Sequence, residues 1–129
     1  MTGPLAGHTI VVTRPAAQAG HFIGLLDAAG AACIALPTLV IERLPVEPGL
    51  AIEALETTWN WALYTSTNAV ECALETLGRL PRAHRVAAVG RATARALEQR
   101  GVAVDLRPES ANSEGLLATP ELADVQDQR

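Results

Sequence analysis

Lysine is absent from this sequence, and its ten basic residues are all arginines, set against fourteen Asp and Glu for a formal net charge of −4. No basic stripe that could follow a phosphate backbone can be drawn, which excludes nucleic-acid binding. Apolar runs stay far below the roughly 20 residues needed to cross a bilayer, and the start lacks the charged, apolar-cored pattern of a signal peptide. The sequence therefore predicts a cytoplasmic protein with no nucleic-acid partner and no membrane partner.

Cysteine and histidine are also scarce. Cys33 and Cys72 lie in apolar surroundings without C-x-x-C spacing, and the three histidines are scattered. These patterns exclude a disulfide framework and a zinc site, so we expect two buried, reduced thiols and no metal. A nucleophile elbow, a P-loop and a dinucleotide glycine motif are missing as well, so neither a covalent nucleophile nor a cofactor is predicted.

Strand and helix periods alternate along the 129 residues, of which 49% are hydrophobic. Apolar strands separated by helices are typical of a parallel sheet covered by helices, so the predicted fold class is α/β. Strands are expected at residues 9–13, 31–36, 61–65, 86–89 and 102–106, and helices at 16–29, 50–55, 68–77, 91–99 and 113–118.

Three further local features carry predictions. Asn68 followed by Glu71 predicts a capping box at the start of a helix. Residues 38–44 lie between prolines and are either an edge strand or a linker. The polar tail, residues 121–129, is expected to be a poorly ordered end or a severed connection.

Polar loops follow four of the expected strands, where ligands bind in open α/β sheets. Each loop leads into a helix, whose free N–H groups and dipole favour anions, although the same residue types also cap helices. The loops span residues 13–15, 65–68, 89–93 and 108–113. The candidate binding residues in them are Arg14, Thr65, Ser66, Asn68, Gly90, Thr93, Ser110 and Ser113.

The aromatic residues are few, and three of the four lie close together in the sequence. Trp59, Trp61 and Tyr64 could stack on a flavin, but core or edge packing is the favoured interpretation because Trp61 and Tyr64 fall on an expected strand.

The order of the loops resembles that of uroporphyrinogen-III synthases. The resemblance covers residues 9–122 and is carried by VTRP at residues 12–15, TSTNAV at 65–70, and VAAVG at 86–90 with Thr93 and Ala94 after it. It implies flavodoxin-like, parallel-sheet units of a two-domain fold. Since family members are about twice this length, both domains are expected to be incomplete: residues 1–36 begin domain 1, 37–45 form the crossover linker, and 46–129 form most of domain 2.

The resemblance also implies an activity. The family closes the linear tetrapyrrole hydroxymethylbilane to uroporphyrinogen III, with inversion of ring D and loss of water, without a cofactor, in heme biosynthesis. Thr65, Ser66 and Asn68 would then line the cleft between domains and donate to substrate carboxylates, with Gly90 and Thr93 beside them. Ser110 and Ser113 would add donors, and Arg14 would face the same cleft.

Two alternatives stay open. The chain could be a non-catalytic α/β binding module for a phosphorylated ligand or a protein partner. It could also be an inactive fragment that self-associates to shield unfinished sheets.

Overall fold

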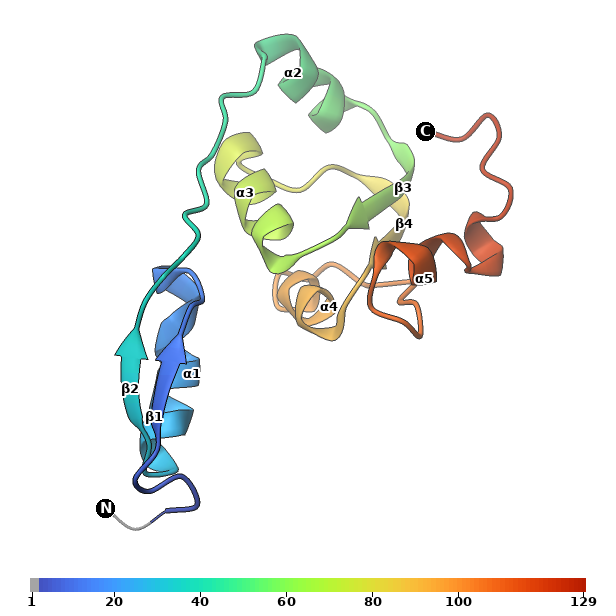
Figure 1. The fold of residues 1–129 in the computed structure, drawn as a ribbon. Coiled ribbons are helices and arrows are strands. Elements are labelled where there is room, and N and C mark those ends of the chain that lie inside the picture. Colours follow the sequence, from blue (N-terminus) through green and yellow to red (C-terminus); the bar gives the residue numbers. More distant parts are fainter. Residues whose placement is uncertain (1–2) are drawn as a thin grey trace. The chain divides into compact units, whose positions relative to one another are not determined.

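The computed structural model describes residues 3–129, which divide into two compact units, residues 3–43 and 44–129 (Figure 1). Unit 1 contains β1 (Thr9–Val12), α1 (Ala16–Ala28) and β2 (Ala32–Ala35). Unit 2 contains α2 (Pro48–Glu56), β3 (Trp59–Tyr64), α3 (Thr67–Leu77), β4 (Ala83–Ala88), α4 (Arg91–Glu98), α5 (Ser113–Leu117) and a short 3-10 helix, Pro120–Leu122. Both units are built on parallel strands joined by helices, so the α/β class is confirmed.

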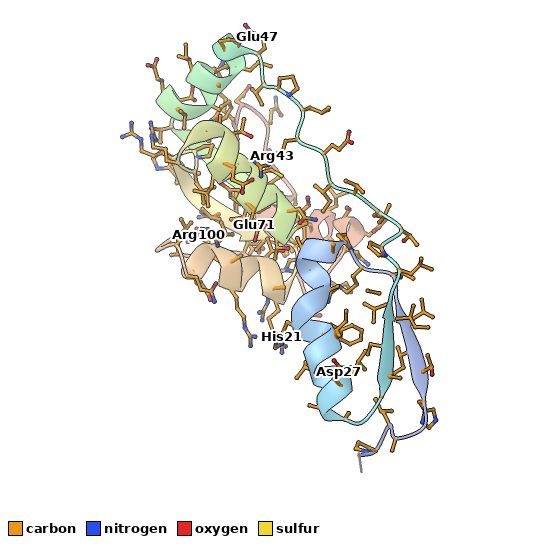
Figure 2. The ribbon with its side chains drawn as sticks, turned by 90° about the vertical axis from the view of Figure 1, so that its left-hand side faces the viewer. His21, Asp27, Arg43, Glu47, Glu71 and Arg100 are labelled. Atoms are coloured by element: carbon orange, nitrogen blue, oxygen red, sulfur yellow. The ribbon has the colours of Figure 1, made fainter. Side chains whose placement is uncertain are left out.

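Unit 1 is a single β-α-β unit. β1 and β2 pair in parallel with Val11 opposite Ile34, and α1 lies along one side of the pair (Figures 1 and 2). α1 ends where Gly30 adopts a positive φ of 91°, a conformation that glycine reaches without strain. Among the described residues of unit 1, the buried apolar ones are Val12, Ala19 and Ala31. This unit therefore encloses only a small core.

Residues 38–44, expected to be an edge strand or a linker, form neither strand nor helix. Thr38 donates both its backbone N–H and its hydroxyl to the carbonyl oxygen of Thr13, each over 3.3 Å. Further on, Glu47 accepts the N–H of Leu50 and so begins α2 (Figure 2).

Unit 2 is layered, with the β3–β4 sheet between two apolar clusters. Alternate residues of β4 face opposite sides, and Val86 and Ala88 pack with α3 and α4. Ala87, on the other face, packs with Leu106 and with Leu116 of α5. Both faces of this parallel sheet are therefore covered over at least part of their area, as such sheets require.

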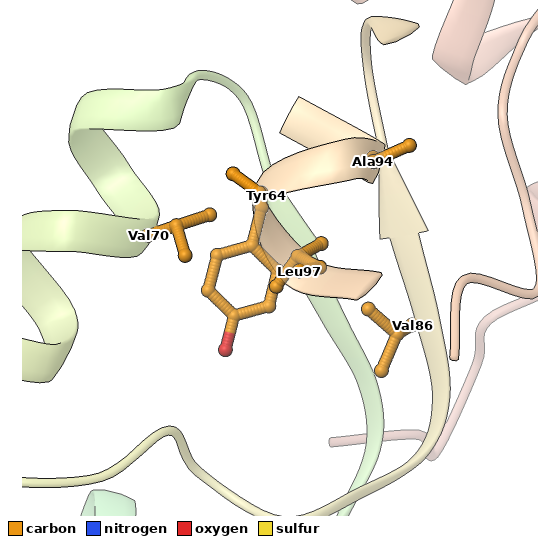
Figure 3. Packing of buried hydrophobic residues seen from close by; sticks show 7 residues of the cluster. Tyr64, Val70, Val86, Ala94 and Leu97 are labelled. Carbon is orange, nitrogen blue, oxygen red and sulfur yellow. The ribbon is translucent and has the colours of Figure 1, made fainter. Parts of the chain in front are cut away.

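The aromatic rings belong to this packing. Tyr64 is 7% exposed, and its ring lies among Val70, Val86 and Leu97 (Figure 3). Burial raises the pKa of its phenol above the ordinary 10.0. Trp61 packs on the opposite face with the Arg85 guanidinium over its ring, 5.4 Å from the centroid.

The strand expected at residues 102–106 is wrong, because only Leu106 bridges to β4. The Asp105 carboxylate accepts the N–H of Val86 over 2.7 Å, in the place where a neighbouring strand would offer a carbonyl. The N–H groups of Asp105 and Leu106 both donate to the carbonyl oxygen of Val86. A side chain thus interrupts the regular ladder, which the apolar pattern of the segment did not indicate.

Strand boundaries also differ from expectation. β3 begins at Trp59 and β4 at Ala83, both earlier than predicted, and these two residues are paired. The pairing of β3 with β4 extends past the polar residues Asn60 and His84. A search for continuous apolar runs stops before these residues.

Two smaller expectations need correction. The tail, expected to be a poorly ordered end or a severed connection, overlaps the 3-10 helix Pro120–Leu122, and the Arg129 carbonyl oxygen accepts the N–H groups of Asn60 and Trp61 on β3. Cys33 and Cys72 are free thiols, but both are half-buried and not fully buried as expected.

Candidate functional site

The carboxyl end of the unit 2 sheet brings polar loops together. The N–H of Val89 donates to the carbonyl oxygen of Tyr64 over 3.0 Å, and the N–H of Ala88 donates to that of Leu106 over 2.9 Å. Three parallel, neighbouring segments therefore end at the same edge of the sheet: β3, β4 and the segment that ends at Leu106. Residues 65–68, 89–93 and 107–113 follow those segments and form what we call the loop edge of unit 2.

The first loop begins α3. Thr65 is exposed, and the Ser66 hydroxyl oxygen accepts the N–H of Ala69 over 3.1 Å. The predicted capping box of Asn68 and Glu71 is wrong: Ser66 is the N-cap, and Asn68 is the second residue of the helix. Ser66 takes this place because its backbone is extended, with φ −157°, and its short side chain reaches the first turn.

The second loop begins α4 at Gly90, which offers no side-chain cap. A Cβ atom added at Gly90 would meet nothing within 4 Å, so the space above this backbone is open. Arg91 is exposed at the first position of α4, whereas Thr93 is only 4% exposed. The loop thus combines open backbone with a cation and an almost buried hydroxyl.

The third loop begins α5 at Asn112, whose side-chain oxygen accepts the N–H of Gly115 over 2.7 Å. Ser113 is exposed at the first helical position. Ser110 packs closely on Gly115, where an added Cβ atom would collide with the Ser110 carbonyl oxygen. A cavity of about 280 Å³ opens beside this contact, lined by Glu109, Ser110, Gly115, Ala118, Thr119 and Pro120.

The structure places seven of the eight predicted binding residues in unit 2, on the loop edge. Arg14 lies in unit 1. It is exposed and stands two residues after the end of β1. The predicted set omits Asn112 and Arg91. An asparagine before a helix and an arginine at its first position are both visible in the sequence, and these signals could have found them.

Two kinds of feature are absent from the described residues. Among residues 3–129, no three His, Cys, Asp or Glu side chains come close enough to hold one metal ion. No helix within the same residues is long and apolar enough to span a bilayer.

Comparisons with known proteins agree with one another. A family model described as Uroporphyrinogen-III synthase HemD matches residues 20–129. The chain is 35% identical over 123 residues to a uroporphyrinogen-III synthase of Synechococcus elongatus, covering 88% of this chain and 46% of that protein. It is 32% identical over 127 residues to a uroporphyrinogen-III synthase of Chlorobaculum parvum, covering 93% of this chain and 50% of that protein.

The fold is shared with a solved structure, that of uroporphyrinogen-III synthetase from Helicobacter pylori 26695. The TM-score is 0.61 at 16% sequence identity, over 92% of this chain and 54% of that one. The chain spans about half the length of the relatives that it matches. Because the family model covers most of the sequence, the chain belongs to the uroporphyrinogen-III synthase family, HemD.

Proposed function

We propose that this chain serves the reaction of its family as a uroporphyrinogen-III synthase: closure of hydroxymethylbilane to uroporphyrinogen III, with inversion of ring D and loss of water, in heme biosynthesis. The observation that carries the proposal is the loop edge of unit 2, where three donor-bearing loops lie side by side. The family match over residues 20–129 supports it. The proposal includes a cytoplasmic location and no cofactor.

In this proposal the loop edge binds the carboxylates of the substrate. The exposed Thr65 hydroxyl can donate to one, and the Ser66 hydroxyl, whose oxygen already accepts from Ala69, still has its own proton to donate. Asn68, Gly90 and Thr93 complete the candidates of the two adjoining loops. With a net charge of −4 the chain as a whole does not attract an acid, so recognition must come from such local donors.

Binding of this kind can itself accelerate the reaction. Holding a flexible, reactive chain in one folded geometry removes much of the entropic cost of ring closure and selects one product over another. The proposed role of the loop edge is therefore positioning, and no side chain in it needs to act as a nucleophile.

The proposal also covers domain organisation. We infer that residues 1–36 begin the first family domain, 37–45 form the crossover and 46–129 form most of the second domain. The division between the two compact units falls after Arg43, inside this crossover, which supports the inference. Arg14, Ser110 and Ser113 stay predicted substrate contacts.

The test supplies freshly generated hydroxymethylbilane, oxidises the products, and separates type I from type III uroporphyrin by chromatography. Type III above the enzyme-free control, from this chain or from the chain extended to family length, is the expected result. The double variant Thr65→Ala/Ser66→Ala should lose about 1 kcal/mol of binding for each hydrogen bond, which is roughly fivefold in KM per bond. Type I product alone at both lengths rejects the function, and unchanged kinetics in the double variant reject the role of these two hydroxyls.

We further propose that the chain self-associates through unit 1. α1 covers one face of the β1–β2 pair, and on the other face Val11 and Ile34 lie opposite each other with 51% and 52% of their surface exposed. Parallel sheets are stable when both faces are covered. Sedimentation velocity should show dimers that dissociate in Val11→Ser/Ile34→Ser, and a monomer at all concentrations would reject the proposal.

A further inference from the structure

The chain changes from one face of the sheet to the other between Val104 and Leu106. In a regular strand, side chains two residues apart point to the same face. Val104 instead packs with the apolar cluster of α3 and α4, whereas Leu106 is buried in the cluster on the opposite face, with Ala87 and with Leu116 of α5. One residue more than the regular period allows therefore lies between them.

The hydrogen bonds show the same extra residue. The N–H groups of Asp105 and Leu106 both donate to the carbonyl oxygen of Val86, over 2.8 and 3.2 Å. Two successive residues that oppose one residue of the neighbouring strand form a β-bulge, which bends the chain and redirects a side chain. The side chain redirected here is that of Leu106, toward α5.

The Asp105 carboxylate replaces the acceptor that the bulge removes. In a regular parallel ladder, the N–H groups of Val86 and Ala88 would donate to carbonyl oxygens two residues apart. Ala88 donates to Leu106 over 2.9 Å, so the regular acceptor for Val86 would be Val104. Val86 donates instead to Oδ2 of Asp105 over 2.7 Å. This side chain therefore ties the bulge to β4.

The bulge lies directly before the third loop of the loop edge. Residues 107–113 follow it and lead into α5, which packs on the sheet through the contact of Leu116 with Leu106. Pro108, two residues after Leu106, is buried as well. The same loop contains Ser110, which lines the cavity beside α5. The place where the bulge turns the chain thus fixes the start of this loop.

We propose that Asp105 is a positioning residue of the loop edge: its carboxylate holds the bulge, and the bulge places residues 107–113 to bind substrate. The role in substrate binding rests on the proposed function. Asp105 acts on the backbone of β4 and takes no part in bond making. Since it supplies a hydrogen-bond acceptor, an uncharged side chain of the same shape should replace it.

The first test follows the bulge by NMR of the ¹⁵N-labelled chain. In Asp105→Ala the N–H of Val86 loses its acceptor, so it should exchange with solvent about tenfold faster, and the amide signals of residues 107–113 should shift. Asp105→Asn keeps an acceptor oxygen and should restore both. The matched control Asp124→Ala removes a carboxylate that accepts the N–H of Gln126 over 3.2 Å, away from the bulge, and should change neither.

The second test measures type III product from hydroxymethylbilane, at a temperature where tryptophan fluorescence shows every variant folded. Asp105→Ala should raise KM roughly fivefold, the scale of one neutral hydrogen bond between loop and substrate, and Asp105→Asn should stay within about twofold of wild type. Ala73→Gly, in the middle of α3, lowers stability without changing the bulge and should leave KM unchanged. A stability loss alone therefore does not reproduce the expected result.

Four results decide the role of Asp105. Loop shifts and a raised KM that Asp105→Asn reverses support it. Unchanged loop signals in Asp105→Ala would overturn it, and so would an equal rise of KM in Ala73→Gly, because the effect would then be general destabilisation. Shifted loop signals with unchanged KM reject the positioning role and uphold the proposed function. If the wild type makes no type III product, at this length or extended to family length, the proposed function fails and the amide signals alone decide whether Asp105 places the loop.

Discussion

Ser66 provides a test in which stability and binding should rank the same set of variants in different orders. Its hydroxyl oxygen caps α3 by accepting the N–H of Ala69 over 3.1 Å. Replacement by alanine removes the cap and should lower the free energy of unfolding by about 1 kcal/mol, or roughly 4–8 °C in Tm for a domain of this size. Ser66→Asp keeps an acceptor and adds a negative charge at the helix start. Its free energy of unfolding should therefore be no lower than that of the wild type, with a gain of about 0.3–1 kcal/mol from the charge.

Binding should rank the same three proteins differently. Alanine loses one neutral donor, whereas aspartate loses the donor and also repels a carboxylate, so affinity should fall in the order Ser, Ala, Asp. Both tryptophans, Trp59 and Trp61, lie in β3, so fluorescence during urea unfolding reports unit 2 alone. Substrate binding is followed through KM for hydroxymethylbilane. If Ser66→Asp retains wild-type KM while Ser66→Ala does not, the serine acts only as a helix cap and the reasoning fails.

Other outcomes follow from the packing of unit 2. Leu97 is fully buried, so Leu97→Ala should lower the free energy of unfolding by about 2–5 kcal/mol in urea, whereas Leu117→Ala, 76% exposed, should change it by less than about 0.5 kcal/mol; similar losses would contradict the assigned core. Gly115→Ala should cost about 1–3 kcal/mol, because its Cβ would collide with the Ser110 carbonyl, and an unchanged urea midpoint would argue against that contact. Burial raises the pKa of Tyr64, so the unfolded state loses its phenolic proton first and stability should fall as pH rises above 10.0; Tyr64→Phe should flatten that decline, and an identical decline in both proteins would exclude Tyr64 as its cause.

Much of the secondary structure could be predicted because its determinants are local. The apolar period places α1 and α3 within a residue of their observed bounds. Gly30, with a φ of 91°, follows the end of α1, where a glycine commonly stops a helix. The polar loops after β3 and β4 were likewise visible, because they interrupt apolar runs. Their nearness to each other follows from parallel pairing and needed only the α/β class.

The errors have equally specific causes. Asn68 and Ser66 are both good N-cap residues two positions apart, and sequence pattern alone does not say which backbone is extended. At residues 102–106 the Asp105 side chain replaces a ladder bond, which depends on Val86 lying opposite it. Such choices are made by contacts between residues far apart in the chain.

By itself, the sequence determined the β-α-β order, the α/β class, the family resemblance and the polar character of the loops, since periodicity, caps and glycines act within a few residues. Only the tertiary structure decided that Thr93 is almost buried, that Arg91 is exposed, and that Tyr64 belongs to the core. Burial and pairing depend on which distant segments cover a side chain, so they are decided when the strands align and the helices close over them.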